Sequence, residues 1–279
     1  MSTWESETPP PESTLRGPAG FLRVVLRGIP LGLLTFGCLA LLLFVRLFER
    51  PLCGVSRPVT PHITRFVCRN AFRILGMKYS VTGAPMRLRG AAVSNHVGWL
   101  DIFSLNAPQS IYFVSKAEVA RWPGIGWLAR ATGTVFIARD RKQAKAQEAT
   151  FRTRLLAGHH LLFFPEGTST DGLTVLPFKS TLFAAFTAPD LRAELHVQPI
   201  TLRYTAPDGE DPRFYGWWGD MEFGPHLLSV LAAPRQGGVE VIFHDPLKVS
   251  DYPDRKALGA ACEAAVRSGL QPEALGQAS

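Results

Sequence analysis

The chain has 279 residues, of which 46% are hydrophobic and 19% charged, and its formal net charge is +7. This length is enough for one α/β domain with additions. The excess charge lies near the N-terminus: the first ninety residues hold twelve Lys or Arg against four Asp or Glu, and the remainder holds eighteen against nineteen. These cations flank the most apolar run without interleaved aromatic residues, which favours an anionic membrane surface and argues against nucleic acid as a partner.

The N-terminal region is predicted to anchor the chain. Residues 1–18 are rich in Ser, Thr, Pro and Glu, a composition typical of a disordered tail. Residues 19–78 are expected to form a membrane-associated helical segment, in which the eighteen residues 28–45 carry no charge. At ~1.5 Å per residue this run reaches ~27 Å, so it can span the ~30 Å hydrocarbon core or enter it as a re-entrant helix. A longer helix requires Arg23 and Arg27 to snorkel, and a buried core helix is the alternative.

A second helix is predicted between Pro58 and Lys78. Arg65, Arg69 and Arg73 recur there at every fourth residue and form a cationic stripe along one side. We expect this helix to lie in the headgroup region with its apolar side toward the lipid. The alternative is a solvated helix that covers the domain that follows.

Residues 79–279 alternate short apolar runs with helical patterns, which predicts an α/β domain with a mixed central sheet flanked by helices. The expected strands are 79–82, 91–94, 111–115, 134–137, 161–164, 197–204 and 239–243. The expected helices are 101–105, 124–131, 142–156, 180–188 and 255–268. The stretch 206–234, rich in Pro, Gly and Trp, receives no assignment.

The segment Asn95-His96-Val97-Gly98-Trp99-Leu100-Asp101 carries a histidine and a carboxylate five positions apart. A neutral imidazole can take a proton from an alcohol at about pH 7, and an aspartate on its other nitrogen fixes the tautomer and stabilises the imidazolium. Five residues correspond to about 140° around a helix, so the two side chains meet only if His96 lies on a turn and Asp101 just inside the next helix. The alternative is an Asn/His turn in which Asp101 is only a first-turn helix charge.

A second motif, Phe164-Pro165-Glu166-Gly167-Thr168-Ser169, follows the strand expected at 161–164. Open α/β sheets bind ligands beyond the carboxyl ends of their strands, so this motif is a candidate ligand site. The alternative is that Thr168 or Ser169 merely caps a turn.

Two cations are candidates for an anionic substrate. Arg139 ends an apolar strand, where a phosphate or carboxylate would be a fitting partner for its guanidinium. A rim arginine paired with Asp140 or Glu166 is the alternative. Lys179 is a weaker candidate for an anionic headgroup or for phosphates of a donor.

No metal site is expected. His159 and His160 lack the spacing of metal-binding histidines and are predicted to be helix-end or loop residues. The four cysteines contain no Cys-x-x-Cys pair, so neither a zinc site nor a disulfide framework is indicated, which is compatible with a reducing cytoplasmic face.

These motifs resemble the glycerolipid acyltransferase family, over about residues 79–202. Its first block, Asn-His-x-x-x-x-Asp, is present from Asn95 to Asp101, and Phe-Pro-Glu-Gly-Thr is present from Phe164 to Thr168. A glycine-started strand ending in arginine matches 133–139, and an apolar-Pro-apolar strand is matched loosely at 197–200.

The resemblance implies residue roles. His96 and Asp101 would be the catalytic pair, in direct transfer without an acyl-enzyme, since no Gly-x-Ser-x-Gly elbow is present. Backbone amides near Gly98 or Gly167 could stabilise the oxyanion. Arg139 would bind the acceptor's phosphate. The remaining substrate-binding candidates are Asn95, Glu166, Gly167, Thr168 and Lys179.

The resemblance also implies a reaction. A membrane-bound O-acyltransferase would move a fatty acyl group from acyl-acyl carrier protein or acyl-coenzyme A to the free hydroxyl of a lysolipid, with no cofactor beyond this co-substrate. We place 1-acyl-sn-glycerol-3-phosphate first as the acceptor, giving phosphatidic acid, because Arg139 sits where a phosphate would bind. Lyso-ornithine lipid is the alternative, because the segments 215–221 and 225–226 resemble that branch. A non-catalytic lipid-binding protein and a thioesterase are the alternatives of other classes. The expected location is the inner membrane, with the catalytic domain facing the cytoplasm.

Overall fold

Eight strands form one mixed sheet in the computed structural model, which describes residues 4–11, 17–137, 144–186 and 191–270. The strands lie in the order β1-β7-β6-β2-β5-β3-β4, and β8 pairs with β6 beside this path. Their bounds are β1 Lys78–Thr82, β2 Gly90–Ser94, β3 Tyr112–Lys116, β4 Val135–Ile137, β5 Leu161–Phe163, β6 His196–Thr205, β7 Gly238–Phe243 and β8 Leu247–Lys248.

The strand directions decide where a site can form. The strands β6, β2, β5, β3 and β4 are parallel, whereas β7 and β8 run antiparallel to β6, so the predicted mixed sheet is confirmed. The carboxyl ends of β2, β5, β3 and β4 therefore meet at one edge of the sheet. Both motifs emerge at this edge, because His96 follows β2 by two residues and Glu166 follows β5 by three.

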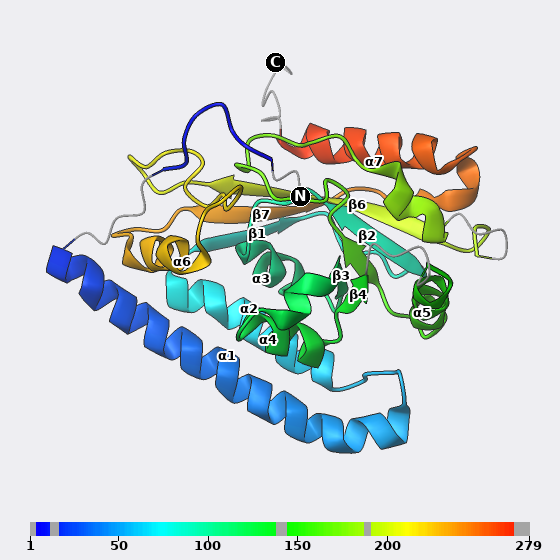
Figure 1. Cartoon of the computed structure of the whole chain (residues 1–279), viewed down its shortest axis with the longest axis horizontal. Coiled ribbons are helices and arrows are strands. Elements are labelled where there is room, and N and C mark those ends of the chain that lie inside the picture. Colours follow the sequence, from blue (N-terminus) through cyan, green and yellow to red (C-terminus); the bar gives the residue numbers. More distant parts are fainter. Residues whose placement is uncertain (1–3, 12–16, 138–143, 187–190, 271–279) are drawn as a thin grey trace, which may run out of the picture.

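Helices cover both faces of the sheet (Figure 1). Helix α7 lies on one face together with the 3-10 helix η3, and α1, α2, α3 and α6 lie on the other. The helix bounds are α1 Gly17–Cys53, α2 Thr60–Leu75, α3 Leu100–Asn106, α4 Ile125–Thr132, α5 Ala144–Leu156, η3 Ser180–Phe186, α6 Phe223–Ala232 and α7 Arg255–Leu270.

Strand β5 shows how the sheet separates two apolar cores. Leu161 and Phe163 belong to the cluster that contains side chains of η3 and α7, whereas Leu162 belongs to the cluster that contains side chains of α2, α3 and α6. All three are buried, as expected for a parallel strand covered on both faces. Alternate side chains of the strand thus pack into opposite cores, and this alternation fixes the register of the central strands.

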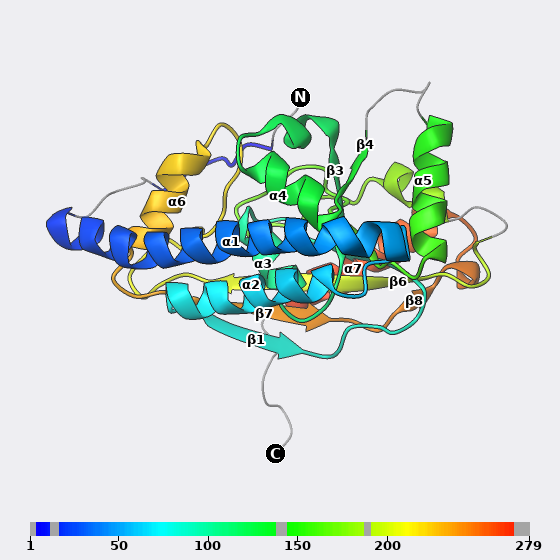
Figure 2. The same cartoon turned by 90° about the horizontal axis from the view of Figure 1, so that it is seen from below.

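Helix α1 is longer than the predicted apolar run, at 37 residues, and it is long and apolar enough to cross a membrane. It lies along α2 on the outside of the fold (Figures 1 and 2). The helix includes Arg23 and Arg27, whose guanidiniums contact α6. Arg23 donates a hydrogen bond to the carbonyl of Ala232, at 3.3 Å, and Arg27 donates to that of Leu231, at 2.9 Å. These carbonyls end α6, where cations are favoured by the helix dipole.

Helix α2 is placed differently from the expected headgroup position. Its apolar side packs into the core through residues such as Phe72 and Leu75. In the predicted cationic stripe, Arg65 donates to the carbonyl of Pro108, at 2.9 Å, and Arg69 to that of Ala107, at 2.7 Å. Two of its three arginines therefore hold the C-terminal end of α3, and the alternative of a helix covering the catalytic domain is correct.

Most expected elements are present within one or two residues of their predicted bounds. The helix expected at 180–188 is the 3-10 helix η3, and residues 187–188 lie outside the described part of the chain. Helix α6 lies in the stretch 206–234 that received no assignment, and β8 was not predicted.

Candidate active site

The imidazole of His96 and the carboxylate of Asp101 meet across a tight turn. Nδ1 of His96 lies 2.7 Å from Oδ2 of Asp101. His96 is on the turn after β2 and Asp101 is the second residue of α3, so the predicted bend is confirmed. The Asp101 side chain is fully buried, whereas the His96 side chain keeps an exposed fraction of 23%. Among the described residues, Nε2 of His96 has no hydrogen-bond partner, which leaves it for an incoming hydroxyl.

Asp101 is surrounded by hydrogen-bond donors. The backbone amides of Val97 and Gly98 donate to Oδ2, at 2.7 and 3.1 Å, and the Tyr204 hydroxyl donates to Oδ1, at 2.9 Å. Burial and the neighbouring carboxylate raise the pKa of the Tyr204 hydroxyl well above its usual value, so this group remains a donor. Because Asp101 offers only acceptor oxygens here, we assign the neutral His96 proton to Nδ1, and Nε2 carries the lone pair.

Asn95 attaches the catalytic turn to strand β6. Its Nδ2 donates to the carbonyl of Leu202, at 2.9 Å, and its Oδ1 accepts the amide of the same residue, at 2.8 Å. The side chain is 1% exposed. This geometry supports a positioning role, and the predicted substrate contact of Asn95 finds no support in it.

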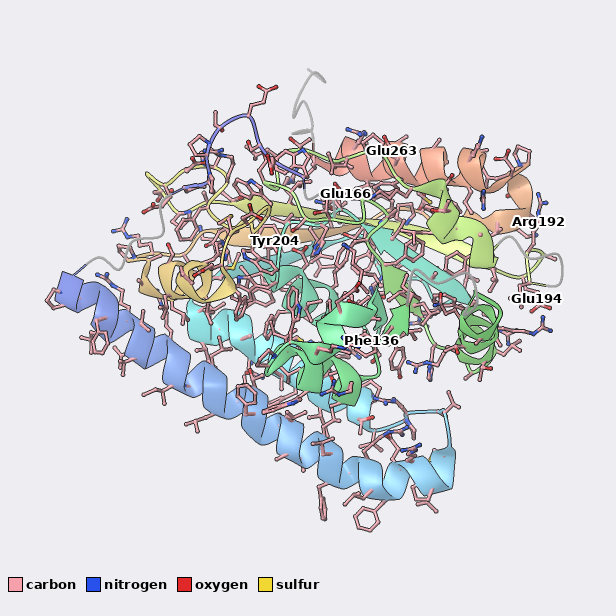
Figure 3. The ribbon with its side chains drawn as sticks, viewed as in Figure 1. Phe136, Glu166, Arg192, Glu194, Tyr204 and Glu263 are labelled. Atoms are coloured by element: carbon pink, nitrogen blue, oxygen red, sulfur yellow. The ribbon has the colours of Figure 1, made fainter. Side chains whose placement is uncertain are left out.

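Glu166 connects the two motifs. Its Oε1 accepts the backbone amide of His96, at 2.7 Å, and its Oε2 accepts that of Leu176, at 2.8 Å. The residue is 1% exposed and lies in the interior, whereas the Tyr204 side chain is only partly buried; both are labelled in Figure 3. Burial raises the pKa of this carboxyl to about 8, although the two backbone donors act in the opposite direction. Glu166 therefore holds the His96 backbone, and its position does not support the predicted headgroup contact.

Two aromatic residues, Phe164 and Trp217, pack against the catalytic turn. The Phe164 ring stacks on His96, with centroids 4.0 Å apart and planes at 10°. The Trp217 amide donates to the carbonyl of Val97, at 2.9 Å, and a Cβ on Gly98 would lie 3.0 Å from the Trp217 Cβ. A side chain at position 98 would press against Trp217, which explains glycine in the motif. The position of His96 is thus fixed by stacking as well as by hydrogen bonds.

Gly167, Thr168 and Lys179 lie together at the second motif, which Glu166 joins to the catalytic turn. Gly167 has φ of +74°, a conformation that favours glycine, and a Cβ there would lie 2.6 Å from Nζ of Lys179. The exposed Lys179 ammonium therefore covers the backbone of the second motif. Thr168 is half-buried, and its hydroxyl makes only a long contact of 3.4 Å with the Ser169 carbonyl. The substrate contacts expected of these three residues stay predictions.

Comparisons with known proteins identify the family of this chain. A protein-family model described as "Acyltransferase" matches residues 81–203. A lyso-ornithine lipid O-acyltransferase of Rhodobacter capsulatus is 62% identical over 269 residues, which cover 96% of each chain. This chain belongs to the glycerolipid acyltransferase family.

Two further members of the family are more distant. A 1-acyl-sn-glycerol-3-phosphate acyltransferase of Neisseria meningitidis is 37% identical over 193 residues, which cover 68% of this chain and 73% of the relative. The crystal structure of the 1-acyl-sn-glycerophosphate acyltransferase of Thermotoga maritima shares the fold, with a TM-score of 0.57 and 20% identity over 88% of this chain and 96% of that chain. The chain is thus an acyltransferase that requires an acyl donor and a lysolipid acceptor, and it is associated with membranes.

Some predicted residues lie elsewhere or cannot be placed. Arg139 lies outside the described residues, and its predicted role stays a prediction; β4 ends two residues earlier, at the edge where the motifs emerge. His159 and His160 lie between α5 and β5, as predicted for loop residues. Within the described ranges no group of three or more His, Cys, Asp or Glu could hold a metal ion.

Sequence reasoning missed the contacts of Tyr204, Phe164 and Trp217 with the catalytic turn. Tyr204 gave a weak signal, because it is a polar-tipped aromatic near the carboxyl end of a long strand. Phe164 was recognised only as part of the second motif, and Trp217 gave no signal, because their contacts with the turn join distant segments.

Proposed function

We propose that this chain is a lyso-ornithine lipid O-acyltransferase. The observation that carries the proposal is the 62% identity, over 96% of both chains, to a protein of that name. The sequence motifs alone placed the phosphate acceptor first, and this comparison reverses the order. Transfer to 1-acyl-sn-glycerol-3-phosphate remains the second candidate, because the Neisseria meningitidis relative of that name is 37% identical over a shorter match.

The reaction follows from the assigned tautomer. Nε2 of His96 accepts the proton of the lysolipid hydroxyl while the hydroxyl oxygen attacks the carbonyl carbon of the acyl thioester. The tetrahedral intermediate then expels the thiolate, and the imidazolium returns its proton to that sulfur. Asp101 stabilises the imidazolium through the 2.7 Å contact with Nδ1. An ester and a free thiol are the products, and His96 is restored.

Amides that follow Gly167 can serve the oxyanion, whereas those of Gly98 and Gly167 themselves cannot. The amide of Gly98 donates to Asp101 and that of Gly167 to the Phe164 carbonyl, at 3.1 Å in both cases, so neither is available. Within the described part of the chain, the amides of Thr168 and Ser169 have no acceptor. They belong to the loop whose next amide, that of Thr170, donates to the His96 carbonyl at 2.9 Å. We infer that one of these two amides stabilises the oxyanion.

The acceptor's charge fits the cation at the site. Ornithine carries a carboxylate, which a lysine or arginine can bind in place of a phosphate. Lys179 lies over Gly167 and is exposed, so it is the described residue best placed for this contact. We propose acyl-acyl carrier protein or acyl-coenzyme A as the donor, without a further cofactor, and the cytoplasmic face of the inner membrane as the location.

An acceptor assay tests the proposal. The purified full-length chain would receive a labelled acyl thioester with lyso-ornithine lipid, with 1-acyl-sn-glycerol-3-phosphate, or with both at equal concentration. We expect the ornithine product to dominate, and His96→Ala to form it about 10²–10⁴-fold more slowly. Product from the phosphate acceptor alone would reject the proposal. Hydrolysis of the thioester that outruns transfer at saturating acceptor would indicate a thioesterase instead.

A further inference from the structure

A pocket of about 810 Å³ lies between the C-terminal end of α1, the loop that follows it, α4 and α5, outside the catalytic turn. Five guanidinium groups line it, from Arg46, Arg50, Arg57, Arg130 and Arg154. No Asp or Glu is among its described lining residues. We call it the arginine pocket.

The positive charge of the arginine pocket is not balanced by the described residues. Arg46 pairs with Glu49, at 3.0 Å, but Glu49 is 5% exposed and also accepts three hydrogen bonds from Val59 and Thr60. The other four guanidiniums have no carboxylate partner among the described residues. Arg57 reaches only a neutral carbonyl, that of Ala131, at 2.7 Å. An anion is the missing partner of this cluster.

Burial makes this imbalance costly. Burial, followed by repulsion from Arg46, lowers the pKa of Arg57. Burial also lowers the pKa of Arg154 to about 10, and repulsion from Arg57 and Arg46 adds to the shift. Arg57 and Arg154 are held by carbonyl contacts, and Arg154 also lies over the Tyr112 ring, at 4.5 Å from its centroid. None of these contacts neutralises the charge of two like groups partly out of water, so a bound anion would stabilise them.

The wall of the arginine pocket is amphiphilic. Leu43, Val55 and Trp127 line it with exposed fractions of 50%, 43% and 59%. Leu43 continues the exposed apolar surface of α1, the helix that is apolar enough to cross a membrane. A ligand that matches both features has an anionic group next to acyl chains, and the end of such a helix is where phospholipid headgroups lie.

We propose that the arginine pocket binds the headgroup phosphate of an anionic phospholipid, with the lipid chains along Leu43 and Trp127. The bound lipid would be a structural one, separate from the acceptor that is acylated. It would fix the C-terminal end of α1 against α4, on the membrane side of the catalytic domain.

Quenching of Trp127 fluorescence tests this inference. The full-length chain in non-ionic detergent is titrated with phosphatidylglycerol carrying brominated chains, and the Trp127→Phe variant isolates the contribution of Trp127. Parallel arms use brominated phosphatidylcholine, and inorganic phosphate as a competitor. The test variant is Arg50→Gln with Arg130→Gln, since both side chains are exposed, and Arg50→Gln alone is the milder version. Arg255→Gln, on α7 at the opposite face, is the matched control.

We expect saturable quenching of Trp127 by phosphatidylglycerol, weakened about 25-fold in the double variant at roughly fivefold per basic residue near the lipid. The Arg255→Gln variant should bind like the unmodified chain. Equal quenching by phosphatidylcholine, or unchanged affinity in the double variant, would overturn the inference. Displacement by equimolar inorganic phosphate would show a general anion site and reject the lipid as its occupant.

Discussion

Replacing Asp101 by Asn tests the tautomer on which the reaction depends. The amides of Val97 and Gly98 both point at the Oδ2 position, at 2.7 and 3.1 Å. An amide nitrogen placed there would face two N–H donors, at a cost of about 1–3 kcal/mol for each unpaired buried group. The Asn oxygen therefore takes this position and still accepts the proton of His96 Nδ1. The Asn nitrogen then faces the oxygen of Tyr204, whose hydroxyl can turn to Ser104, 3.0 Å away.

The variant should consequently lose charge but keep the tautomer. A hydrogen bond to a charged group contributes about 1.5–3 kcal/mol and a neutral one about 1 kcal/mol, so the loss is roughly 1–2 kcal/mol. This corresponds to about a 5- to 30-fold decrease in kcat/KM. If the imidazole instead adopted the other tautomer, the proton on Nε2 would block base catalysis and the loss would be on the order of 10⁴.

Initial rates of acyl transfer with varied lysolipid acceptor in detergent micelles measure this difference. Asp101→Ala is the comparison variant, because it removes the acceptor from three buried donors as well as from His96. We expect it to lose more activity than the Asn variant and to unfold at a lower temperature. A loss near 10⁴ for Asp101→Asn, or equal losses for the two variants, would refute the argument from the backbone amides.

Three further substitutions test other parts of the site. His96→Ala should lower the transfer rate by about 10²–10⁴, because the general base is removed, with little change in thermal unfolding; residual transfer within tenfold of the unmodified chain would contradict this role. Asn95→Ala should lower the free energy of unfolding by about 2–5 kcal/mol, because it leaves both backbone groups of Leu202 unpaired inside the protein. Denaturant unfolding measures that effect, and a change below about 0.5 kcal/mol would contradict it. Glu166 holds its proton more tightly when folded, with a pKa of about 8 against an ordinary value of 4.5, so its contribution to stability is present at low pH and is lost as pH rises toward 8. The advantage of the unmodified chain over Glu166→Gln should therefore fall between pH 5 and 8, by at most about 1.4 kcal/mol per pH unit; a constant difference would show that this carboxyl does not titrate there.

The sequence allowed the catalytic bend to be predicted, because the constraint is local. Five residues cannot bring two side chains together along one helix, so His96 and Asp101 could meet only across a turn. Apolar runs before and after the motif located the strand and the helix that make this turn. Apolar runs also located the other central strands, because strands that are buried on both faces consist mostly of apolar residues.

The roles of Asn95 and Glu166 could not be read from the sequence in the same way. Both residues belong to the two motifs that form the site. The side chains of both form hydrogen bonds with backbone groups of distant segments. A polar residue next to a catalytic one gives the same sequence signal whether it touches substrate or holds the turn. Only the strand order and register separate the two roles.

The arginines of α1 and α2 show a related ambiguity. A cationic stripe on a helix next to an apolar anchor is compatible with lipid headgroups, and equally with the carbonyl ends of other helices. Arg27 and Arg69 bind such carbonyl ends, on α6 and α3 respectively. Which of the two partners the arginines bind depends on the helices that pack nearby, and the spacing of residues in the sequence does not reveal this.

The register between β2 and β5 explains how motifs far apart in the chain form one site. Ala91 pairs with Leu161 and Val93 with Phe163, so the two strands are offset by seventy residues throughout. The same offset relates His96 to Glu166, which is why the carboxylate of one meets the amide of the other just past the strand ends. A slip of one residue would reverse the faces of β5 and bury its core side chains on the wrong side. The packing of Leu161, Leu162 and Phe163 therefore fixes the catalytic geometry, although none of these three side chains takes part in the reaction.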